Sequence, residues 1–360
     1  MTKGKSLPAA LGYRMPAEWE PHESTWLAWP HSRGDWPGKF EPIPWVYAEI
    51  VRNLARHERV DLIVNDASSE KRAEAVLDKA GALSDRVCFH RWRTDRVWTR
   101  DSGCIFLTPS AQRDRDDAGP AALHFQFNAW AKYPNYKFDE KNGEHMAKAA
   151  GVREVHPFVG KRRVVLEGGS IDVNGSGTLL TTEECLLSTT QQRNPSMDRA
   201  AYDQMFADYF GVQTVIWLDS GITGDDTHGH VDDITRFVGP NTVVTMIEPN
   251  PQSENYAPLR VNLGRLKNAR TADGKKLEIV EIAMPRPVIF EDRQLPASYA
   301  NFYIANGAVL VPVFNDPNDR VALNTLADLF PTREIVPIYS GDLIWGFGAL
   351  HCMTQQQPAA

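Results

Sequence analysis

The sequence predicts one closed α/β domain built from repeated units. Three β-hairpin patterns turn at Asn174, Pro240 and Asn306, so consecutive turns lie 66 residues apart. A fourth run with the same step turns at Thr108, where a polar insert lengthens the hairpin. Repeats of this length bury their apolar faces against neighbouring units, so we expect the units to close into a ring. The alternative is that the spacing only reflects ordinary domain dimensions.

Within each unit the order is helix, strand and hairpin. β-rich runs around turn dipeptides predict hairpins at 170–182, 234–247 and 301–314. The helix expected at 197–210 has apolar side chains at helical spacing, with Ser196 as N-cap and Gly211 as stop signal. The predicted helices lie at 68–81, 144–151, 197–210, 257–269 and 321–330, and the strands that follow them at 86–92, 164–173, 214–219, 277–284 and 334–340.

The composition is that of an ordinary globular protein, because 42% of the 360 residues are hydrophobic and 24% are charged. A net charge of -7 argues against binding to nucleic acid, which needs a basic face. The sequence has neither a signal-peptide pattern nor a membrane-spanning apolar run. We therefore expect a cytoplasmic protein without a membrane partner. We also expect a single catalytic domain over residues 1–360, with flexible tails at 1–12 and 359–360, and leave open whether it forms a homo-oligomer.

The repeat aligns a set of carboxylates. Asp101, Glu167 and Asp233 each stand seven residues before a turn, and Tyr299 takes the same position in the last unit. In a ring, equivalent positions face a common centre, where three acids are costly unless a cation lies among them. The alternative for each acid alone is that it begins a solvated hairpin.

The residues beside these acids suit a cation-binding catalytic site. Trp98 offers an aromatic face to a cation, although a tryptophan alone is more often a core residue. His230 and Asp232 lie two apart, so on a strand they would face the same side and could move protons near neutral pH. A histidine with several acids around it is a stronger catalytic candidate than a histidine alone.

A metal-dependent hydrolase is the rival interpretation of the "HGHVD" stretch. The HxH pair of His228 and His230 supplies two ligands, but such sites need more histidines or carboxylates from other strands. Only His351 follows in the sequence, and no HxxxH or CxxC pattern occurs. We therefore expect neither a catalytic metal nor a cofactor.

Cys352 is the candidate nucleophile. The sequence has four widely spaced cysteines, which we expect to be free thiols, and three of them lie in apolar strand-like runs typical of inert cysteine. Cys352 instead follows two glycines and His351, and a bound cation or a protonated imidazole would lower its pKa. A thiolate beside converging carboxylates indicates covalent attack on an electrophilic carbon, and acceptor oxygens suit a planar guanidinium.

Together, "MPAEWEPHESTWLAWP", "VWTRDSG", "FNAW", "LEGGSIDVNGSGTLLTTEECLL", "GDDTHGHVDD", "ASYANFYIANGAVLVP" and "LHCMTQQQP" resemble the agmatine deiminase family. This family is a branch of the guanidine-modifying (pentein) superfamily and is related to bacterial-type peptidylarginine deiminases. The resemblance runs from Met15 to Pro358. It implies a five-bladed pseudo-symmetric α/β propeller of repeated ββαβ units. It also implies hydrolysis of agmatine to N-carbamoylputrescine and ammonia, in putrescine biosynthesis, without cofactor or metal.

The resemblance also assigns roles to this chain's residues. It implies that Cys352 is the nucleophile and His230 the general acid and base. By the same resemblance, Asp101 and Asp232 clamp the guanidinium, and Glu167 orients the histidine. The family's aspartate corresponds to Asp232, one residue before the position that the 66-residue step gives.

Recognition of the substrate's tail is less defined. Agmatine carries a distal ammonium, so we expect an acid such as Asp226 or Asp225 to meet it, with Trp98 and Gly348 also contacting the substrate. Cys104, where many relatives have proline, and Phe347, inside a glycine run, depart from the family pattern and are interpreted as changes in packing. Two alternatives stay open: deimination of a peptidylarginine or another guanidine, and non-catalytic binding of a polyamine.

Overall fold

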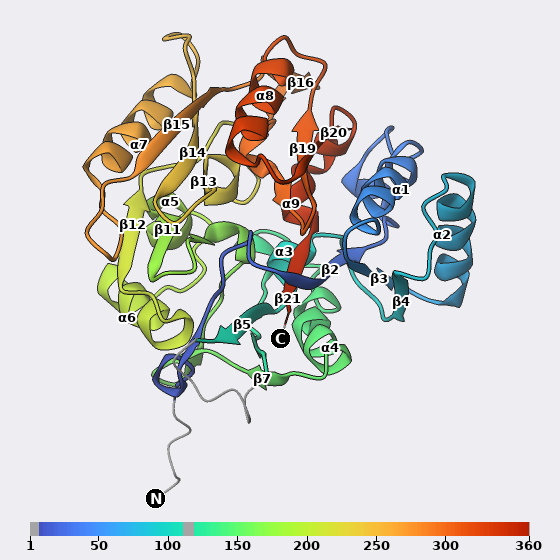
Figure 1. Ribbon diagram of the computed structural model, residues 1–360, viewed down its shortest axis with the longest axis horizontal. Helices are drawn as coiled ribbons and strands as arrows, with labels where there is room; N and C mark the ends of the chain where they lie inside the picture. Colours follow the sequence, from blue (N-terminus) through green and yellow to red (C-terminus); the bar gives the residue numbers. More distant parts are fainter. Residues whose placement is uncertain (1–6, 111–118, 360) are drawn as a thin grey trace, which may run out of the picture.

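A computed structural model describes residues 7–110 and 119–359 of the chain. The described part is a mixed α/β structure with five sheets of three or four strands, and two further two-stranded sheets. In Figure 1 the long helices lie at the periphery, while two one-turn helices, α3 (Thr99–Ser102) and α9 (Leu350–Met353), lie near the middle. The polar insert predicted after Thr108 falls largely outside the described residues.

Four of the five sheets repeat one arrangement. Each has an antiparallel hairpin, then a helix, then a strand parallel to the second hairpin strand. The units are β5 (Ile105–Pro109), β6 (Ala121–Leu123), α4 (Asn142–Ala149) and β7 (Arg153–Val155); β10 (Asp172–Val173), β11 (Thr178–Thr182), α6 (Arg199–Phe210) and β12 (Thr214–Leu218); β13 (Thr235–Phe237), β14 (Thr242–Ile247), α7 (Tyr256–Asn268) and β15 (Glu278–Ala283); β18 (Tyr303–Ile304), β19 (Ala308–Val313), α8 (Asp319–Leu329) and β20 (Glu334–Tyr339).

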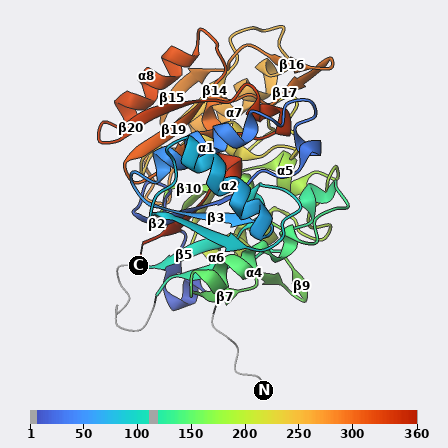
Figure 2. The ribbon, with the colours of Figure 1, turned by 90° about the vertical axis from the view of Figure 1, so that its right-hand side faces the viewer.

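The fifth sheet joins the two ends of the described chain. Its hairpin pair consists of β21 (Gln355–Pro358) and β2 (His22–Ala28), which run antiparallel. Strands β3 (Arg59–Val64) and β4 (Val87–Arg91) then follow in parallel. Helices α1 (Ile43–Leu54) and α2 (Ala67–Lys79) connect them and lie over this sheet in Figure 2.

Shorter elements complete the chain. They are β1 (Tyr13–Arg14), which pairs with β5, the small hairpins β8 (Phe158–Val159) with β9 (Arg162–Arg163) and β16 (Val288–Phe290) with β17 (Arg293–Leu295), α5 (Glu183–Leu187), and the 3-10 turns η1 (Ala9–Leu11), η2 (Arg33–Asp35), η4 (Ala129–Ala131), η5 (Asp139–Lys141) and η9 (Leu343–Gly346). Among the described residues, no helix combines the length and apolar composition that a membrane span requires.

The even spacing of the hairpin turns has a structural basis. Asn174 Nδ2 donates a hydrogen bond to the carbonyl oxygen of Pro240 over 2.7 Å, so turns one repeat apart touch each other. Asn306, one repeat further, exchanges two hydrogen bonds of 2.8 Å with the backbone of His22 at the start of β2. The three turn positions singled out in the sequence therefore tie neighbouring units together.

Five single-turn helices gather at the inner ends of the five sheets. Each one directly precedes the first strand of a hairpin pair: α3, η6 (Gly168–Ser170), η7 (Val231–Asp233), η8 (Tyr299–Asn301) and α9. They contact one another in a closed cyclic order, α3 to η6, η6 to η7, η7 to η8, η8 to α9, and α9 back to α3. Segments far apart in sequence thus meet at one centre.

Some sequence expectations for the helices were wrong. The N-cap of α6 is Asp198, whose carboxylate accepts from the Ala201 backbone N–H at 2.9 Å, whereas Ser196 accepts from an arginine side chain instead. Gly211 ends this helix at φ 72°, as predicted. Helix α1 was not predicted; Pro44 lies in its first turn, where proline is tolerated because the N–H needs no helical partner.

The expected tails are only partly described. Residues 1–6 and 360 lie outside the described residues. Ala9–Leu11 already form a 3-10 turn, and the backbone N–H of Ala359 donates to the Pro21 carbonyl over 2.8 Å. Regular structure therefore begins earlier than the tail expected at 1–12.

Candidate active site

A cavity of about 340 Å³ lies beside the inner turns α3 and α9, and Trp98, Asp101, Asp226, Gly348 and Cys352 help to line it. These residues come from three of the sequence stretches that were predicted to form the site. Glu167, His230 and Asp232 are fully buried beside the lining residues.

Three carboxylates surround the imidazole of His230. Its Nδ1 lies 3.9 Å from Asp101 Oδ1 and 4.0 Å from Asp232 Oδ1, and its Nε2 lies 3.8 Å from Glu167 Oε2. Burial disfavours the imidazolium, but Asp101 and then Glu167 and Cys185 nearby raise the pKa of His230 well above its usual value. The histidine therefore holds a proton at neutral pH.

Gly169 is a glycine because other side chains of the site approach its backbone closely. A Cβ at Gly169 would lie 2.6 Å from His230 Nδ1, 2.9 Å from Asp101 Oδ1 and 3.0 Å from Asp232 Oδ2. No side chain fits there. Its backbone N–H also donates to Asp101 Oδ1 over 3.0 Å, so Gly169 both admits and fixes the acid cluster.

Glu167 is held ionised by an arginine that the sequence did not single out. Arg193 Nε lies 3.1 Å from Glu167 Oε1, and both side chains are fully buried. Burial raises the pKa of the Glu167 carboxyl, but Arg193 and His230 outweigh it and hold this pKa at about 2. Arg193 leaves Glu167 Oε2 free to face His230.

The pKa values of the neighbouring acids Asp232 and Asp233 are shifted in opposite directions. Burial raises the pKa of both carboxyls, but His351, whose Nδ1 lies 2.6 Å from Asp232 Oδ2, and His230 bring the pKa of Asp232 below its usual value. The pKa of Asp233 is raised well above its usual value by burial and by the charge on Asp232. The ionised acceptor at this position is Asp232.

His230 and Asp232 were expected to share the face of a strand. They instead lie at the start of the 3-10 turn η7, with His230 at its N-cap position. The turn still brings both side chains to the centre, because it packs against the equivalent turns of the neighbouring units.

Cys352 faces the acids from α9, and its thiol is less acidic than the sequence suggested. Its Sγ lies 3.8 Å from Asp232 Oδ2 and accepts from Asn301 Nδ2 at 3.1 Å. Burial, and next the negative charges of Asp232, Asp233 and Asp101, raise the pKa of Cys352 well above its usual value. The lowered pKa expected from a nearby imidazolium was wrong for the site as it stands, because burial and then the charges of the acids outweigh that charge.

Several buried atoms of the cluster make no hydrogen bond within the protein. Glu167 Oε2 and Asp232 Oδ1 accept none, and both ring nitrogens of His230 are likewise without a partner. Unsatisfied buried oxygens are costly, so they indicate a ligand that donates hydrogen bonds. A guanidinium is flat and offers five N–H donors.

The same cluster contains two groups with the donor types of a metal site. Glu167, Cys185 and His230 offer ligand atoms within 4.8 Å of one another, as do Asp232, Asp233 and Cys352. Cys185 was interpreted from the sequence as an inert strand cysteine. It lies in helix α5 and is buried next to Glu167 and His230.

Comparison with known proteins shows which family the chain belongs to. The family model of the Porphyromonas-type peptidyl-arginine deiminases matches residues 14–358. The chain belongs to this family. Among its curated relatives, an agmatine deiminase of Pseudomonas aeruginosa is 34% identical over 379 aligned positions, which cover 100% of this chain and 99% of the relative.

Solved structures agree with this membership. An agmatine deiminase of Enterococcus faecalis superposes with a TM-score of 0.88 at 28% identity, covering 99% of this chain and 98% of that one. A substrate-bound agmatine deiminase of C. jejuni gives a TM-score of 0.83 at 29% identity over 96% of both chains. This family member therefore shares the fold of those enzymes along its length.

In this member of the Porphyromonas-type family, Asp226 is already engaged. Its Oδ1 lies 2.5 Å from Lys132 Nζ and 3.2 Å from an Arg293 nitrogen, and its Oδ2 accepts from the Tyr133 hydroxyl at 2.5 Å. Asp225 accepts hydrogen bonds from the backbone N–H groups of Thr227, Gly229 and His230. The carboxylates of both acids expected at the substrate's tail are therefore hydrogen-bonded to other groups of the protein.

Trp98, Gly348 and Phe347 shape the wall beside the thiol. A Cβ at Gly348 would lie 2.8 Å from the Trp98 ring and 3.1 Å from Cys352 Cβ, so only glycine fits between them. Phe347 takes a φ of 66°, its ring lines the cavity, and Arg293 lies 4.3 Å above the ring. Phe347 is thus more than a packing change, whereas Cys104 is fully buried away from the cavity lining.

A second layer behind Asp232 was missed from the sequence. His351 Nε2 lies 2.8 Å from Glu18 Oε2, and the other oxygen of Glu18 lies 2.9 Å from Arg236. Arg100 also approaches Glu18, at 3.2 Å. The "EWEP" and "HC" motifs contain Glu18 and His351, but only the fold brings these two stretches together.

Proposed function

We propose that this protein is an agmatine deiminase, a hydrolase that converts agmatine and water to N-carbamoylputrescine and ammonia in putrescine synthesis. The observation that carries the proposal is the pair of buried acceptor oxygens without partners, Glu167 Oε2 and Asp232 Oδ1, together with the Cys352 thiol, whose Sγ lies 3.8 Å from the other oxygen of Asp232. The named relatives and solved structures, which are agmatine deiminases, support it.

The acids bind the guanidinium. Asp101, Asp232 and Glu167 accept N–H groups of the planar cation, which satisfies the buried oxygens Asp232 Oδ1 and Glu167 Oε2 that have no partner within the protein. Asp101 keeps its position through Trp130, whose Nε1 donates to Asp101 Oδ2 over 2.9 Å. The bound positive charge offsets the acids, and so it lowers the pKa of the Cys352 thiol toward thiolate formation.

The chemistry then proceeds in two halves. The Cys352 thiolate attacks the guanidinium carbon, and the C–N bond to one terminal nitrogen breaks as the His230 imidazolium gives that nitrogen a proton. Ammonia leaves, and an amidino thioether remains on Sγ. Neutral His230 next takes a proton from water, which attacks the same carbon. The C–S bond breaks, and the ureido product and Cys352 are released.

Asp35, which no motif indicated, is our candidate for the distal ammonium. It lines the same cavity as Cys352, and its Oδ2 is buried without a hydrogen-bond partner. The nearest cation is Arg96, with Nε 4.0 Å from Oδ1, and both terminal nitrogens of Arg96 already donate to Asn135. Unlike Asp226, Asp35 has an oxygen available to a substrate.

The position of Asp35 along the cavity wall supports this assignment. The next residue, Trp36, packs against Trp98 with ring centroids 5.9 Å apart. Trp98 in turn reaches Gly348 beside Cys352. Burial raises the pKa of Asp35 to about 6, with Arg96 opposing it, so the carboxyl is mostly ionised at neutral pH.

For the fold, we propose that the five units are the blades of one closed propeller over residues 1–360. Two features support it: the cyclic contacts of the five inner turns, and the pairing of the C-terminal strand β21 with β2, which closes the first sheet with the last strand. We also propose a cytoplasmic location, in keeping with four free cysteines and no disulfide among the described residues.

Ammonia release from agmatine tests the proposed function. Cys352→Ala should abolish release while the circular dichroism spectrum and the melting temperature stay close to wild type. Cys88→Ala, at a half-buried cysteine in β4, is the matched control and should keep full activity. Tight agmatine binding by the wild-type protein without any ammonia release would favour a polyamine-binding protein instead.

Two further comparisons separate the enzyme alternatives. Turnover of agmatine, free arginine and arginyl peptides should favour agmatine, because Asp35 offers a carboxylate to an ammonium. A preference for arginyl peptides would favour peptidylarginine deimination, for which Arg96 and Arg293 near the cavity could meet a carboxylate. Thiol alkylation should abolish activity and chelator treatment should not; the reverse would favour a metal hydrolase.

A further inference from the structure

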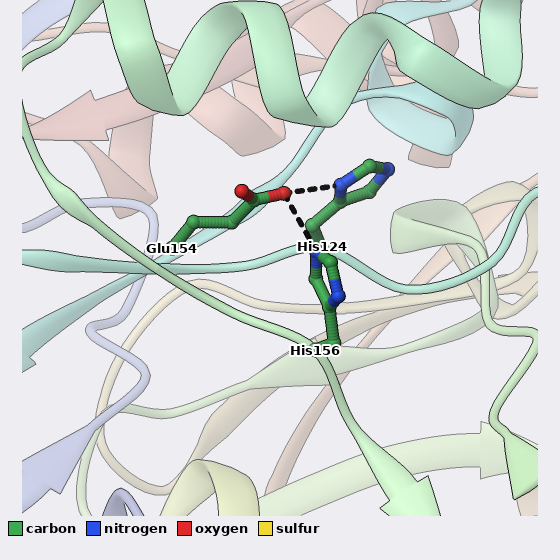
Figure 3. A group of neighbouring side chains, drawn as sticks. All are labelled: His124, Glu154 and His156. Carbon is green, nitrogen blue, oxygen red and sulfur yellow. Dashed lines mark hydrogen bonds and ion pairs between the residues drawn. The ribbon is translucent and has the colours of Figure 1, made fainter.

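A second group of potential ligands lies in the unit that contains α4, apart from the residues that line the central cavity. His124 directly follows β6, Glu154 lies in β7, and His156 follows β7. Strands β6 and β7 run parallel with Leu123 opposite Val155, so the three polar side chains come to one place (Figure 3). Glu154 and His156 are two residues apart on the chain and face the same way.

The three side chains converge on one carboxylate oxygen. His124 Nδ1 lies 2.6 Å and His156 Nε2 lies 2.8 Å from Glu154 Oε1. All three ligand atoms lie within 4.8 Å of one another, and the two imidazole rings are at 83° with centroids 5.3 Å apart. Figure 3 shows both imidazoles directed at this oxygen.

The hydrogen bond of His124 Nε2 determines whether Nδ1 is a donor or an acceptor in the neutral ring. Nε2 lies 2.9 Å from the carbonyl oxygen of Glu140, which can only accept, so Nε2 carries a hydrogen. In the neutral ring Nδ1 is then an acceptor, yet it faces the Glu154 carboxylate at 2.6 Å. At 2.6 Å a proton lies between the two atoms. A metal ion bound by both would displace this proton and move Nδ1 and Oε1 further apart, because tetrahedral zinc bonds of about 2.0–2.2 Å need a wider gap.

The surroundings hold His124 in the orientation of a metal ligand. A ligating histidine commonly donates its second N–H to a backbone carbonyl, as His124 does to Glu140. Gly143 in α4 packs against the ring so closely that a Cβ there would lie 2.6 Å from His124 Cδ2. The ring is thus fixed before any ion arrives.

The group is accessible from solvent. His124 is buried, but the His156 side chain is 44% exposed. Glu154 and His156 line a surface cavity of about 450 Å³. An ion can enter from this side, and water can complete its coordination.

We propose that His124, Glu154 and His156 bind one divalent transition-metal ion, with Zn²⁺ as the natural occupant. Two imidazole nitrogens and one carboxylate oxygen are a common zinc ligand set, with water in the fourth position. Imidazole favours zinc over Mg²⁺ or Ca²⁺, which prefer oxygen ligands. The Arg163 guanidinium, which donates to the His124 carbonyl over 2.8 Å, adds a nearby positive charge that opposes binding.

A titration of the full-length, chelator-treated protein with Co²⁺, followed by visible absorption, and with Zn²⁺, followed by calorimetry, tests the site. We expect one ion per chain and a cobalt spectrum without a thiolate charge-transfer band. The same binding should persist in Cys352→Ala, because the proposed ligands are imidazoles and a carboxylate. This variant separates the site from the groups around the thiol.

The ligand variants decide the outcome. His156→Asn, at an exposed residue, should fold normally by circular dichroism and weaken Zn²⁺ binding about 10-fold or more, and Glu154→Gln should do the same. His145→Asn in α4, outside the group, should bind as wild type. Absence of stoichiometric binding, or binding that His156→Asn and Glu154→Gln leave unchanged, would overturn the proposal and leave a shared proton between His124 and Glu154.

Discussion

Asn301 Nδ2 lies 3.1 Å from Cys352 Sγ and donates a hydrogen bond to it. The same amide group donates to Asp233 Oδ1 at 2.9 Å, and Asn301 Oδ1 accepts from the backbone N–H groups of His351 and Cys352. The side chain is almost completely buried. Asn301 therefore fixes the turn that carries the thiol and is a direct hydrogen-bond donor to Sγ.

Removing this donor should slow catalysis. A hydrogen bond to a charged group is worth about 1.5–3 kcal/mol, so Asn301→Ala should lower kcat about 10- to 100-fold by destabilising the thiolate. KM for agmatine should change little. Steady-state kinetics on protein checked by circular dichroism measure the effect. A kcat within twofold of wild type would show that the Asn301 hydrogen bond does not stabilise the thiolate.

The reactivity of the free enzyme's thiol should depend strongly on pH. Burial and the nearby acids raise the pKa of Cys352 well above its usual value, so the thiol is protonated at neutral pH. Inactivation by iodoacetamide, an uncharged reagent, should be slow at pH 7 and should still be rising above pH 9. Asp232→Asn removes one negative charge and should speed inactivation at pH 8. A plateau below pH 8 in the wild type would contradict the assigned charges.

The assignment of the distal ammonium to Asp35 predicts a defect in binding. Loss of one partner of a desolvated charge pair costs about 2–5 kcal/mol, so Asp35→Asn should raise KM for agmatine about 30-fold or more and alter kcat only slightly. An alkylguanidine without an ammonium should be turned over equally by wild type and variant. Glu41→Gln, at an exposed acid after η2, is the matched control.

The same carboxyl gives a pH signature. Its pKa of about 6 is raised, so protonation begins near pH 6 as the pH falls, and the protonated carboxyl cannot pair with an ammonium. The titratable groups that face it are the Arg96 guanidinium, which is charged, and the Tyr47 phenol, which stays neutral because burial and Asp35 raise its pKa. KM for agmatine should therefore rise below pH 6 in the wild type. In Asp35→Asn this rise should be smaller, and the part that remains belongs to Asp101, whose pKa burial also raises to about 6. An identical rise in both proteins would show that Asp35 is not responsible.

Glu18 should matter for stability. Burial raises the pKa of its carboxyl, but Arg236, His351 and Arg100 outweigh burial and hold the pKa well below the usual value. Glu18→Gln leaves Arg100 without its carboxylate partner, while Arg236 keeps Asp172 and His351 keeps Asp232. The substitution should cost about 3–5 kcal/mol, seen as a lower midpoint in urea or heat. Glu20→Gln, whose ion pair with Arg14 is about one-third exposed, should cost about 1 kcal/mol or less.

The acid dependence of stability has a definite sign. Because the folded pKa of Glu18 is depressed, its contribution is fully present above the unfolded pKa and is lost as the pH falls through the folded value. Wild-type stability should therefore fall more steeply below pH 4 than that of Glu18→Gln. Parallel acid curves for the two proteins would show that Glu18 is not responsible.

The sequence predicted the repeat better than the contacts between its units. The turns at Asn174 and Pro240 were found because turn chemistry is local, and they meet in the structure. The pairing of Glu167 with Arg193 and of His351 with Glu18 could not be found, because only the closed arrangement brings these residues together.

The repeat spacing did not give the position within a turn; the family resemblance, which selected Asp232, did. Asp232 and Asp233 are adjacent, and the spacing of the repeat favoured Asp233. Burial raises the pKa of both carboxyls. At Asp232 the charges of His351 and His230 reverse this effect, whereas at Asp233 the charge on Asp232 adds to burial and outweighs the hydrogen bond from Asn301. Asp226 looked available in sequence, yet Lys132 occupies it from a segment almost one hundred residues away.

The central claim is covalent catalysis by Cys352 on a guanidinium that the acids hold. Mass spectrometry of the wild-type protein, acid-quenched during turnover of agmatine, tests it most directly. The account predicts an added mass equal to agmatine minus ammonia on the peptide that contains Cys352, and on no other cysteine peptide. Rapid ammonia release with that peptide unmodified at every quench time, together with full turnover by Cys352→Ala, would contradict it.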